Sequence, residues 1–429
     1  MKGTMVNNTV SDNQFSFLAI LKFAVCIMLF GLASRFLLSS DHQFVQLSPF
    51  LIATDQKTSP PSVSNQLRAN LEHRSSRTVK CDLFRGDWIA DAKGPFYTNQ
   101  TCSSIQTHQN CMKNGRPDMD YIHWRWRPRD CELPRFDPGK FLNLMRSRSM
   151  AFIGDSIMRN HVQSLLCILS QDVKVDEVYH DEPYKSRRWY FPANNFTLSV
   201  VWSPYLTKAV IFEDNDGVST DIVRLHLDKP DEIWTDQFKS FDYVILAGGK
   251  WFLKPAIYYE KDEIVGCHSC NEKNITELGF DHVYRKALTS TLEYILRSKH
   301  ENVNVLFRTT TPDHFENGEW NTGGYCNRTL PFKEGEAEMN GMDELMHQIE
   351  VKEFERALTI LGSNEKGLTL KLFDTTYLSL LRPDGHPGIY RHMQPSLAVQ
   401  NDCLHWCLPG PIDSWNDLMM EMIFPFLGR

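Results

Sequence analysis

The chain of 429 residues has no excess of positive charge and no long charge-free hydrophobic run. Its 46 lysines and arginines are outnumbered by 53 aspartates and glutamates, and the net charge of −7 argues against a nucleic-acid partner. No second CxxC accompanies Cys267-His-Ser-Cys270, so we expect a local disulfide there and no metal site. No internal repeat is found. A hydrophobic content of 42% is nevertheless typical of a chain with a sizeable folded core.

The most apolar segment, Phe15 to Leu38, contains only two charged residues. Its charge-free part, Phe23 to Ser34, is shorter than the ~20 residues that cross a bilayer, but the Lys22 amine can reach the headgroups. We therefore expect a cytosolic tail at residues 1–14, a transmembrane signal anchor at residues 15–38 and a body in the lumen of the secretory pathway. A signal peptide cleaved near Ala33 is the alternative.

Glycosylation acceptors and cysteines independently indicate a lumenal body. Asn-x-Ser/Thr triplets beyond the apolar segment predict four glycosylation sites: Asn99, Asn195, Asn274 and Asn327. Ten of the eleven cysteines also follow the apolar segment. An even number of cysteines in an oxidising compartment predicts disulfides.

Two regions separate the apolar segment from the main domain. Residues 39–80 are polar, contain Ser-Pro-Pro-Ser and predict a flexible stem. Residues 81–148 contain four cysteines and many turn residues, but little helical or strand periodicity. They predict an irregular, disulfide-rich N-terminal subdomain that packs on the domain that follows.

From residue 149 onward, strand and helix patterns alternate. Short apolar runs predict strands at residues 150–153, 196–203, 242–249 and 303–309, and periodic patterns predict helices at residues 158–170 and 280–298. The alternation predicts an α/β fold for residues 149–429, a three-layer α/β/α sandwich with a mostly parallel sheet. In such a fold the active site lies at the carboxyl ends of the strands.

The tripeptide Gly154-Asp155-Ser156 joins the first of these strands to a helix. A sharp turn at this place lifts Ser156 above the sheet and directs helix amides toward a bound group, as a nucleophilic serine and its oxyanion need. Asp155 is expected to support the turn. The alternative is that the tripeptide only caps the helix, because Asp and Ser are good N-cap residues.

A nucleophilic serine needs a histidine base, and two late clusters offer one: Asp384 with His386, and Asp402 with His405. Residues three apart on a helical turn share a face, so Asp402 can orient the His405 imidazole toward Ser156. The prolines around Asp384 and His386 indicate a substrate-side loop instead. The alternative is a cystine-rich C-terminal loop in which these residues are incidental.

Together, Gly154-Asp155-Ser156 and Asp402-x-x-His405 resemble the first and last blocks of the SGNH, or GDSL, esterase superfamily. The segments "CDLFRGDWI", "NCMKNGRPDMDYIHWRWRPRDCELPRFDP", "GDSIMRN" and "DCLHWCLPGPIDSWN", in this order, are similar to the plant trichome-birefringence-like family of polysaccharide O-acetyltransferases. The resemblance runs from about Cys81 to the C-terminus. It implies an SGNH-like catalytic domain at residues 149–429 and a Golgi membrane protein of type II.

The chemistry that the resemblance implies is a Ser156, His405 and Asp402 triad that passes an acetyl group through an acetyl-serine to a polysaccharide hydroxyl. No bound cofactor is expected. The acetyl donor is either acetyl-CoA or a membrane-delivered intermediate, the latter with an acetyl-donor membrane protein as partner. The asparagine that follows the central strand of many SGNH enzymes is missing here, so the oxyanion donor is the Ser156 amide, Gly248 or Asn160.

The resemblance also implies how the cysteines pair, although the sequence alone permits many connectivities. The implied disulfides are Cys81–Cys131, Cys102–Cys167, Cys111–Cys407, Cys326–Cys403 and Cys267–Cys270. The third of these would place the cysteine-rich subdomain beside His405 and make it part of the active-site wall.

The candidate contacts to a sugar acceptor are Trp124, Trp126, Arg159 and Trp251, with the Trp320 ring as a further candidate. Flat aromatic faces stack on pyranose rings, and arginines donate to sugar hydroxyls. The alternative is that the first two tryptophans form the small core of the cysteine-rich subdomain. The motifs are most similar to the xyloglucan-modifying branch of the family, with xylan and mannan as other acceptors.

Two other functions fit the same residues. A lumenal carbohydrate esterase differs only in that water, not a sugar hydroxyl, meets the acyl-enzyme. A noncatalytic polysaccharide-binding protein would not need an intact set of serine, aspartate and histidine.

Overall fold

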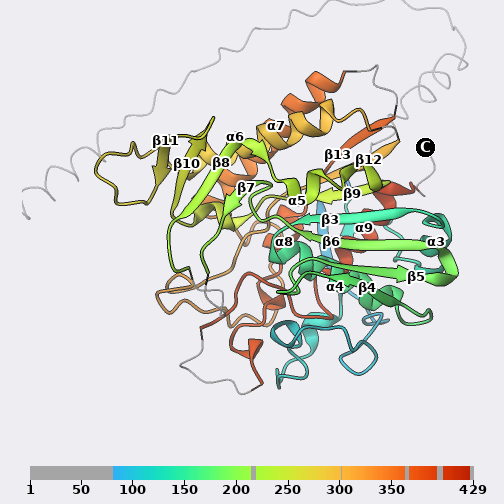
Figure 1. Cartoon of the computed structure of the whole chain (residues 1–429). Coiled ribbons are helices and arrows are strands. Elements are labelled where there is room, and N and C mark those ends of the chain that lie inside the picture. Colours follow the sequence, from blue (N-terminus) through green and yellow to red (C-terminus); the bar gives the residue numbers. More distant parts are fainter. Residues whose placement is uncertain (1–80, 214–218, 301, 363–366, 394–399, 426–429) are drawn as a thin grey trace, which may run out of the picture. The chain divides into compact units, whose positions relative to one another are not determined.

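The computed structural model describes residues 81–429, except residues 214–218, 301, 363–366, 394–399 and 426–429 (Figure 1). The predicted cytosolic tail, signal anchor and stem, residues 1–80, lie outside the described residues. Within the part that is described, no helix combines the length and the apolar character that crossing a bilayer requires.

A seven-stranded sheet organises the part from residue 149 onward. Its first five strands run parallel to one another, and the two at the other edge join as antiparallel hairpin neighbours. The order is β13 (Leu368–Phe373), β12 (Val303–Arg308), β9 (Tyr243–Leu246), β3 (Ser149–Gly154), β6 (Phe196–Trp202), β5 (Arg187–Phe191) and β4 (Asp176–His180). The mostly parallel sheet is confirmed, and all four predicted strands belong to it.

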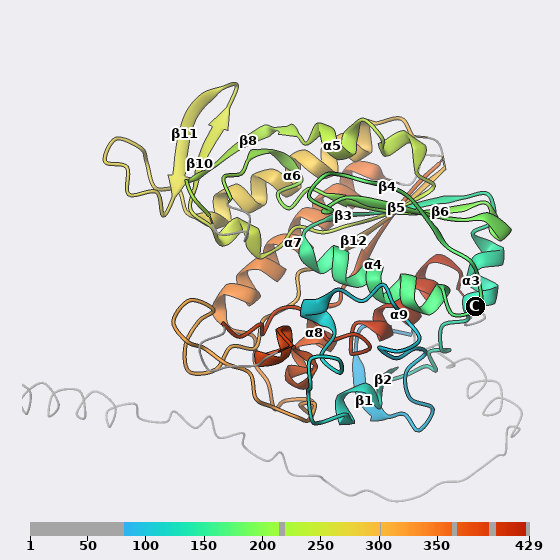
Figure 2. The same cartoon turned by 60° about the horizontal axis from the view of Figure 1, so that its bottom comes forward.

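Helices cover both faces of this sheet (Figure 2). Along β3, Met150 and Phe152 pack into one apolar cluster, whereas Ala151 and Ile153 pack into a second cluster on the opposite face. On the first face lie α3 (Pro138–Leu144), α4 (Ser156–Leu169) and α9 (Asp413–Ile423); on the second lie α5 (Glu232–Thr235), α6 (Phe280–Arg297) and α7 (Gly341–Leu361). The three-layer α/β/α sandwich is therefore confirmed.

A second sheet of four strands packs against α6 and was not predicted. Its order is β11 (Glu263–His268), β10 (Ala256–Glu260), β8 (Val223–Pro230) and β7 (Thr207–Val210). Leu225 and Leu227 bury its inner face in the same cluster as α6. Polar residues alternate with apolar ones along β8, and β7, β10 and β11 are no longer than six residues, so no long apolar run marked them in the sequence.

The cysteine-rich subdomain is largely irregular, as predicted, but contains two antiparallel strands, β1 (Gly86–Ala90) and β2 (Trp124–Pro128). Its short helices and those of the later loops are η1 (Thr107–Gln109), η2 (Asp120–Ile122), η3 (Pro192–Asn194), η4 (Phe238–Ser240), η5 (Lys250–Leu253), α8 (Thr376–Leu380), η6 (Pro383–Gly385) and η7 (Ile389–Arg391). Trp88 and Trp126 pack edge to face, 5.7 Å between ring centroids, within the cluster that also contains α4 and α9. The described residues from Cys81 onward accordingly belong to one compact unit.

Candidate active site

Ser156 stands at the sharp turn between β3 and α4. Gly154 adopts a φ of 153°, and a Cβ atom at this position would lie 2.7 Å from the Ala247 carbonyl oxygen, so only glycine fits. The Asp155 carboxylate caps α4 by accepting a hydrogen bond from the Ile157 N–H at 2.9 Å. Asp155 therefore supports the turn, and the partly exposed Ser156 follows as the first residue of the helix.

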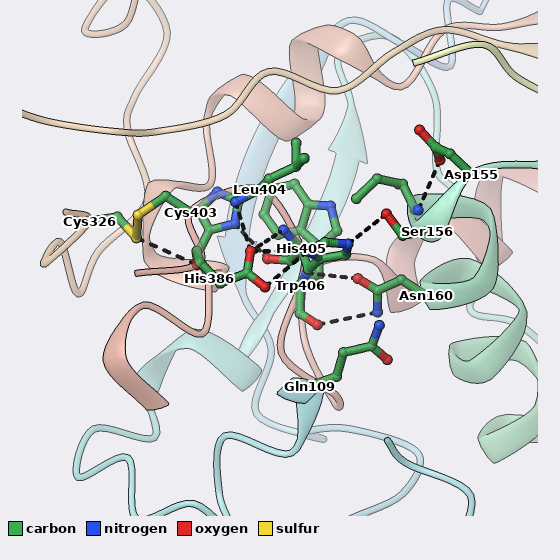
Figure 3. Close-up of polar contacts among 12 residues, drawn as sticks. Gln109, Asp155, Ser156, Asn160, Cys326, His386, Cys403, Leu404, His405 and Trp406 are labelled. Atoms are coloured by element: carbon green, nitrogen blue, oxygen red, sulfur yellow. Dashed lines mark hydrogen bonds and ion pairs between the residues drawn. A yellow bond between two sulfur atoms is a disulfide. The ribbon is translucent and has the colours of Figure 1, made fainter. Parts of the chain in front are cut away.

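The His405 side chain connects Ser156 to Asp402 (Figure 3). His405 Nε2 lies 2.8 Å from Ser156 Oγ, and His405 Nδ1 lies 2.9 Å from Asp402 Oδ2. Because a carboxylate accepts, Nδ1 carries the proton in the neutral ring, and Nε2 is left to accept the Ser156 hydroxyl proton. This arrangement has the geometry that a histidine base and its orienting carboxylate require.

Asp402 is an ionised carboxylate in this arrangement. It is 6% exposed, and burial by itself would raise its pKa. The adjacent His405 imidazole and its hydrogen bonds outweigh burial and hold the pKa of Asp402 well below the usual range. The same carboxylate accepts the His405 backbone N–H at 3.0 Å, so the predicted spacing of three residues closes a local turn.

All five implied disulfides are present in the structure, and two of them flank His405. Cys326–Cys403 and Cys111–Cys407 attach the two ends of the segment Asp402–Cys407, which we name the His405 loop. The second bond brings η1 of the cysteine-rich subdomain to the site, as expected. Cys267 and Cys270 lie near Glu277, but their sulfur atoms form a disulfide with each other.

Asn160, one of the predicted oxyanion donors, contacts the His405 loop through both ends of its carboxamide, and its role as a donor stays a prediction. Its side-chain oxygen accepts the Trp406 N–H at 2.7 Å, and its amide donates to the Trp406 carbonyl at 3.2 Å. Fully buried one turn after Ser156, it connects α4 to the His405 loop. Gly248 follows β9 and packs against the Tyr284 ring, and its role, like that of the Ser156 amide, stays a prediction.

The predicted sugar contacts have different positions. Trp126 is 1% exposed and donates its indole N–H to the Leu83 carbonyl, so its assignment as a sugar contact is wrong and the core interpretation is correct. Trp124 is half-buried against the same cluster. Trp251 is partly exposed and packs edge to face against the Trp202 ring. The Arg159 guanidinium on α4 lies over the same Trp202 ring, 5.2 Å from its centroid.

The segment around Asp384 and His386 is not a substrate-side loop, contrary to the prediction. Asp384 is 1% exposed and forms a bidentate pair with the buried Arg382 guanidinium, both contacts measuring 2.8 Å. His386 is 4% exposed and donates from Nδ1 to the His405 carbonyl at 2.7 Å. The neighbouring Pro383 and Pro387 are also buried, so this segment is part of the protein interior that contacts the His405 backbone.

His108 is a residue of the site that sequence reasoning missed. Its ring from η1 meets the His405 ring edge to face, with centroids 6.0 Å apart. Burial, together with the nearby His405, lowers the pKa of His108 to about 4, so its imidazole is neutral. The implied Cys111–Cys407 disulfide could have indicated this contact, because Cys111 is three residues from His108 and Cys407 is two residues from His405.

Two sets of surface predictions lie apart from these contacts. Asn195, Asn274 and Asn327 are exposed and Asn99 is partly exposed, so each sequon is accessible, and glycosylation itself stays a prediction. Trp320 is 60% exposed, and its contact with a sugar stays a prediction.

Comparison with known proteins accounts for almost the whole described part. Residues 133–422 match the PC-Esterase family, a GDSL/SGNH-like acyl-esterase family found in Pmr5 and Cas1p, and residues 79–132 match the PMR5 N-terminal domain. Protein trichome birefringence-like 25 of Arabidopsis thaliana is 51% identical over 99% of this chain and 95% of its own length.

Two further relatives carry a functional name. Xyloglucan O-acetyltransferase 2 of Populus trichocarpa is 46% identical over 80% of this chain and 82% of its own, and xyloglucan O-acetyltransferase 1 of Arabidopsis thaliana is 44% identical over 80% of each. These matches confirm the resemblance drawn from the motifs. The chain belongs to the PC-esterase family of GDSL/SGNH-like proteins, together with the trichome-birefringence-like proteins.

Proposed function

We propose that this chain is a Golgi polysaccharide O-acetyltransferase that acetylates a plant cell-wall hemicellulose, with xyloglucan as the favoured acceptor. The hydrogen-bonded series Asp402, His405 and Ser156 carries the proposal. The xyloglucan O-acetyltransferases among the relatives support the acceptor class. Xylan and mannan are the other acceptors to test.

The geometry supports a double-displacement reaction. In the first half, His405 Nε2 takes the Ser156 hydroxyl proton while Oγ attacks the acetyl carbonyl carbon, and the leaving group of the donor departs with that proton. In the second half, a sugar hydroxyl gives its proton to Nε2 and attacks the acetyl-serine. Ser156 Oγ then departs and recovers the proton. Asp402 stays ionised and stabilises the imidazolium in both halves.

The donor and the compartment are parts of the same proposal. The donor is acetyl-CoA or an acetyl group delivered across the membrane by a partner protein. Residues 15–38 would anchor the protein in the Golgi membrane with its body in the lumen. Amides at the start of α4, that of Ser156 first, would bind the oxyanion, a contribution of about 3 to 4 kcal/mol per donor in comparable sites.

A carbohydrate esterase is the second candidate, because the matching family is described by its acyl-esterase character. Both reactions use the same acetyl-serine. They differ in whether the site admits water or a sugar hydroxyl to the second half-reaction.

The test incubates the full-length protein with acetyl donors and deacetylated xyloglucan, xylan and mannan, and measures acetylated glycan and free acetate. We expect glycan acetylation that falls by at least ~10³-fold in Ser156→Ala and in His405→Ala. Ser170→Ala, at the far end of α4, is the matched control and should keep full activity. Acetate release without glycan product would identify an esterase, and glycan binding without either product would identify a noncatalytic protein.

A further inference from the structure

Two histidines in contact lie directly behind the His405 loop. His386 Nδ1 faces the His405 carbonyl oxygen at 2.7 Å, and His314 Nε2 faces the Leu380 carbonyl oxygen at 2.9 Å. The two remaining nitrogens, His386 Nε2 and His314 Nδ1, lie 2.7 Å apart. All four ring nitrogens therefore have a hydrogen-bonding partner.

Donor and acceptor accounting shows that two neutral rings do not satisfy these contacts. A carbonyl oxygen only accepts, so His386 must carry its proton on Nδ1 and His314 must carry its proton on Nε2. A neutral imidazole has a single N–H. The two facing nitrogens would then both present lone pairs at 2.7 Å, a repulsive contact. One additional proton between them turns this contact into a charge-assisted hydrogen bond.

We propose that His314 and His386 share one additional proton and that this buried imidazolium–imidazole pair positions the His405 loop. His386 then holds the His405 carbonyl from behind while Asp402 orients the ring of the same residue. Both histidines are positioning residues, since they act through the backbone of His405. The consequence for acetyl transfer rests on the proposed function, but the shared proton does not.

One contact of the pair favours a delocalised positive charge. The Trp406 indole stacks on the His386 ring, with centroids 4.3 Å apart and 26° between planes, which presents an aromatic face to a cation. The charged groups that face the pair are Asp313, Asp384 and Lys250 toward His314, and Asp402 and Arg116 toward His386. Most of these groups have partners of their own, since Lys250 pairs with Asp313 and Arg382 with Asp384.

Burial opposes positive charge on the pair. It lowers the pKa of His386, as does the adjacent His314, and it lowers the pKa of His314. Burial therefore opposes the shared proton too, which the hydrogen-bond geometry alone retains, and it disfavours a second additional proton still more. The shared proton is lost as the pH rises. Without it the facing lone pairs repel, and His386 loses the support that fixes its bond to the His405 carbonyl.

The first experiment follows acetyl transfer by the full-length protein across pH in the wild type, His314→Asn and His314→Leu. An asparagine amide can donate to Nε2 of a neutral His386 without any additional proton. We expect the His314→Asn to wild-type activity ratio to increase about tenfold from acidic to alkaline pH, the effect of one charge-assisted hydrogen bond. His314→Leu should have lower transfer activity than the wild type at every pH. His180→Asn, on the surface, should have the same pH profile of activity as the wild type. A His314→Asn profile parallel to that of the wild type would overturn the proposal.

The second experiment needs no catalysis. Histidine-selective ¹⁵N labelling of the full-length protein reports the protonation of each ring nitrogen by NMR. At acidic pH we expect a strongly deshielded shared proton that disappears in His314→Asn and in His386→Asn. If the facing nitrogens of both rings, His314 Nδ1 and His386 Nε2, were unprotonated at every pH, the pair would be refuted. A shared proton in a protein without transfer activity would instead show that the proposed function is wrong while the pair stands.

Discussion

The proposed nucleophile and the proposed base are held in place by different means. Ser156 is positioned by its own neighbours: the end of β3, the turn at Gly154 and the cap from Asp155, all within three residues. His405 lies in an irregular loop, and its turn through Asp402 is the only part of its support that is local in sequence.

The rest of the support for His405 comes from segments far away in the chain. Cys111, Asn160, Cys326 and His386 contact the His405 loop from four separate places, two through disulfides and two through hydrogen bonds. A short turn can place one side chain accurately, whereas a loop without helical or strand hydrogen bonds needs external contacts to reach the same precision. We therefore expect substitutions near Ser156 and substitutions at the distant contacts of His405 to reduce acetyl transfer to different extents.

Among changes that leave Ser156, His405 and Asp402 in place, the largest effect is expected on the serine side, from Gly154→Ala. The new Cβ would lie 2.7 Å from the Ala247 carbonyl, so the turn must shift. Because a misplacement of about 1 Å costs roughly 100-fold in rate, we expect acetyl transfer to fall by about that factor. Steady-state kinetics, with circular dichroism to verify folding, measures it. Gly139→Ala at the start of α3, where no backbone atom is close, is the control. Unchanged transfer by Gly154→Ala would show that the turn does not position the serine.

A smaller effect is expected on the histidine side, from Cys111→Ser with Cys407→Ser. Removing this bond should lower the free energy of unfolding by about 2 to 5 kcal/mol and reduce transfer per folded molecule about tenfold. Denaturant unfolding and kinetics measure the two quantities.

Removal of Cys81–Cys131 provides the matched control, since that bond does not touch the His405 loop. Cys81→Ser with Cys131→Ser should lose stability but keep its transfer activity. Equal losses of activity in the two double variants would contradict the role assigned to Cys111–Cys407.

Asn160→Ala should have a milder effect. It leaves the buried Trp406 N–H and carbonyl without their side-chain partners, a cost of about 1 to 3 kcal/mol, and should reduce transfer a few-fold. Thermal unfolding and kinetics are the measurements. Gln163→Ala, one turn later on α4, removes a side-chain contact to the Gln106 N–H and should reduce stability alone. Were both variants equally active, Asn160 would have no special connection to the loop.

The smallest effect on transfer is expected from Asp413→Asn, which tests pH dependence at the start of α9. Burial raises the pKa of Asp413 to about 6, against about 3.9 in an unfolded chain. The folded state therefore binds the proton more tightly, and this stabilisation, present below about pH 4, is lost as the pH rises through about 6.

Asp413→Asn should remove about 2 to 3 kcal/mol of that pH dependence while transfer stays unchanged. Denaturant unfolding at a series of pH values from 4 to 8 measures it. Asp417, whose pKa burial raises to about 7, keeps its own contribution in the variant. An identical pH dependence of the variant and the wild type would show that Asp413 does not ionise in this range.

Much of the fold and the three central residues of the site could be predicted from the sequence. The strand at residues 150–153 is buried on both faces, so it reads as a continuous apolar run, and the family motifs add Ser156, Asp402 and His405. The second sheet was missed because its strands are half exposed and mix polar with apolar residues. Trp126 and His386 were placed in the wrong environment, since residue type alone does not distinguish a buried support from a group that faces a ligand.

The sequence by itself determined the elements whose signals are local: the apolar runs, the turn at Gly154-Asp155-Ser156 and the spacing of Asp402 and His405. Backbone geometry and short-range hydrogen bonds fix these within a few residues. Only the tertiary structure decided which partner each buried polar group finds, as with Asn160 on Trp406 and His386 on His405. The first of these contacts joins residues 246 positions apart. They depend on how the layers pack, and no local pattern in the chain encodes that packing.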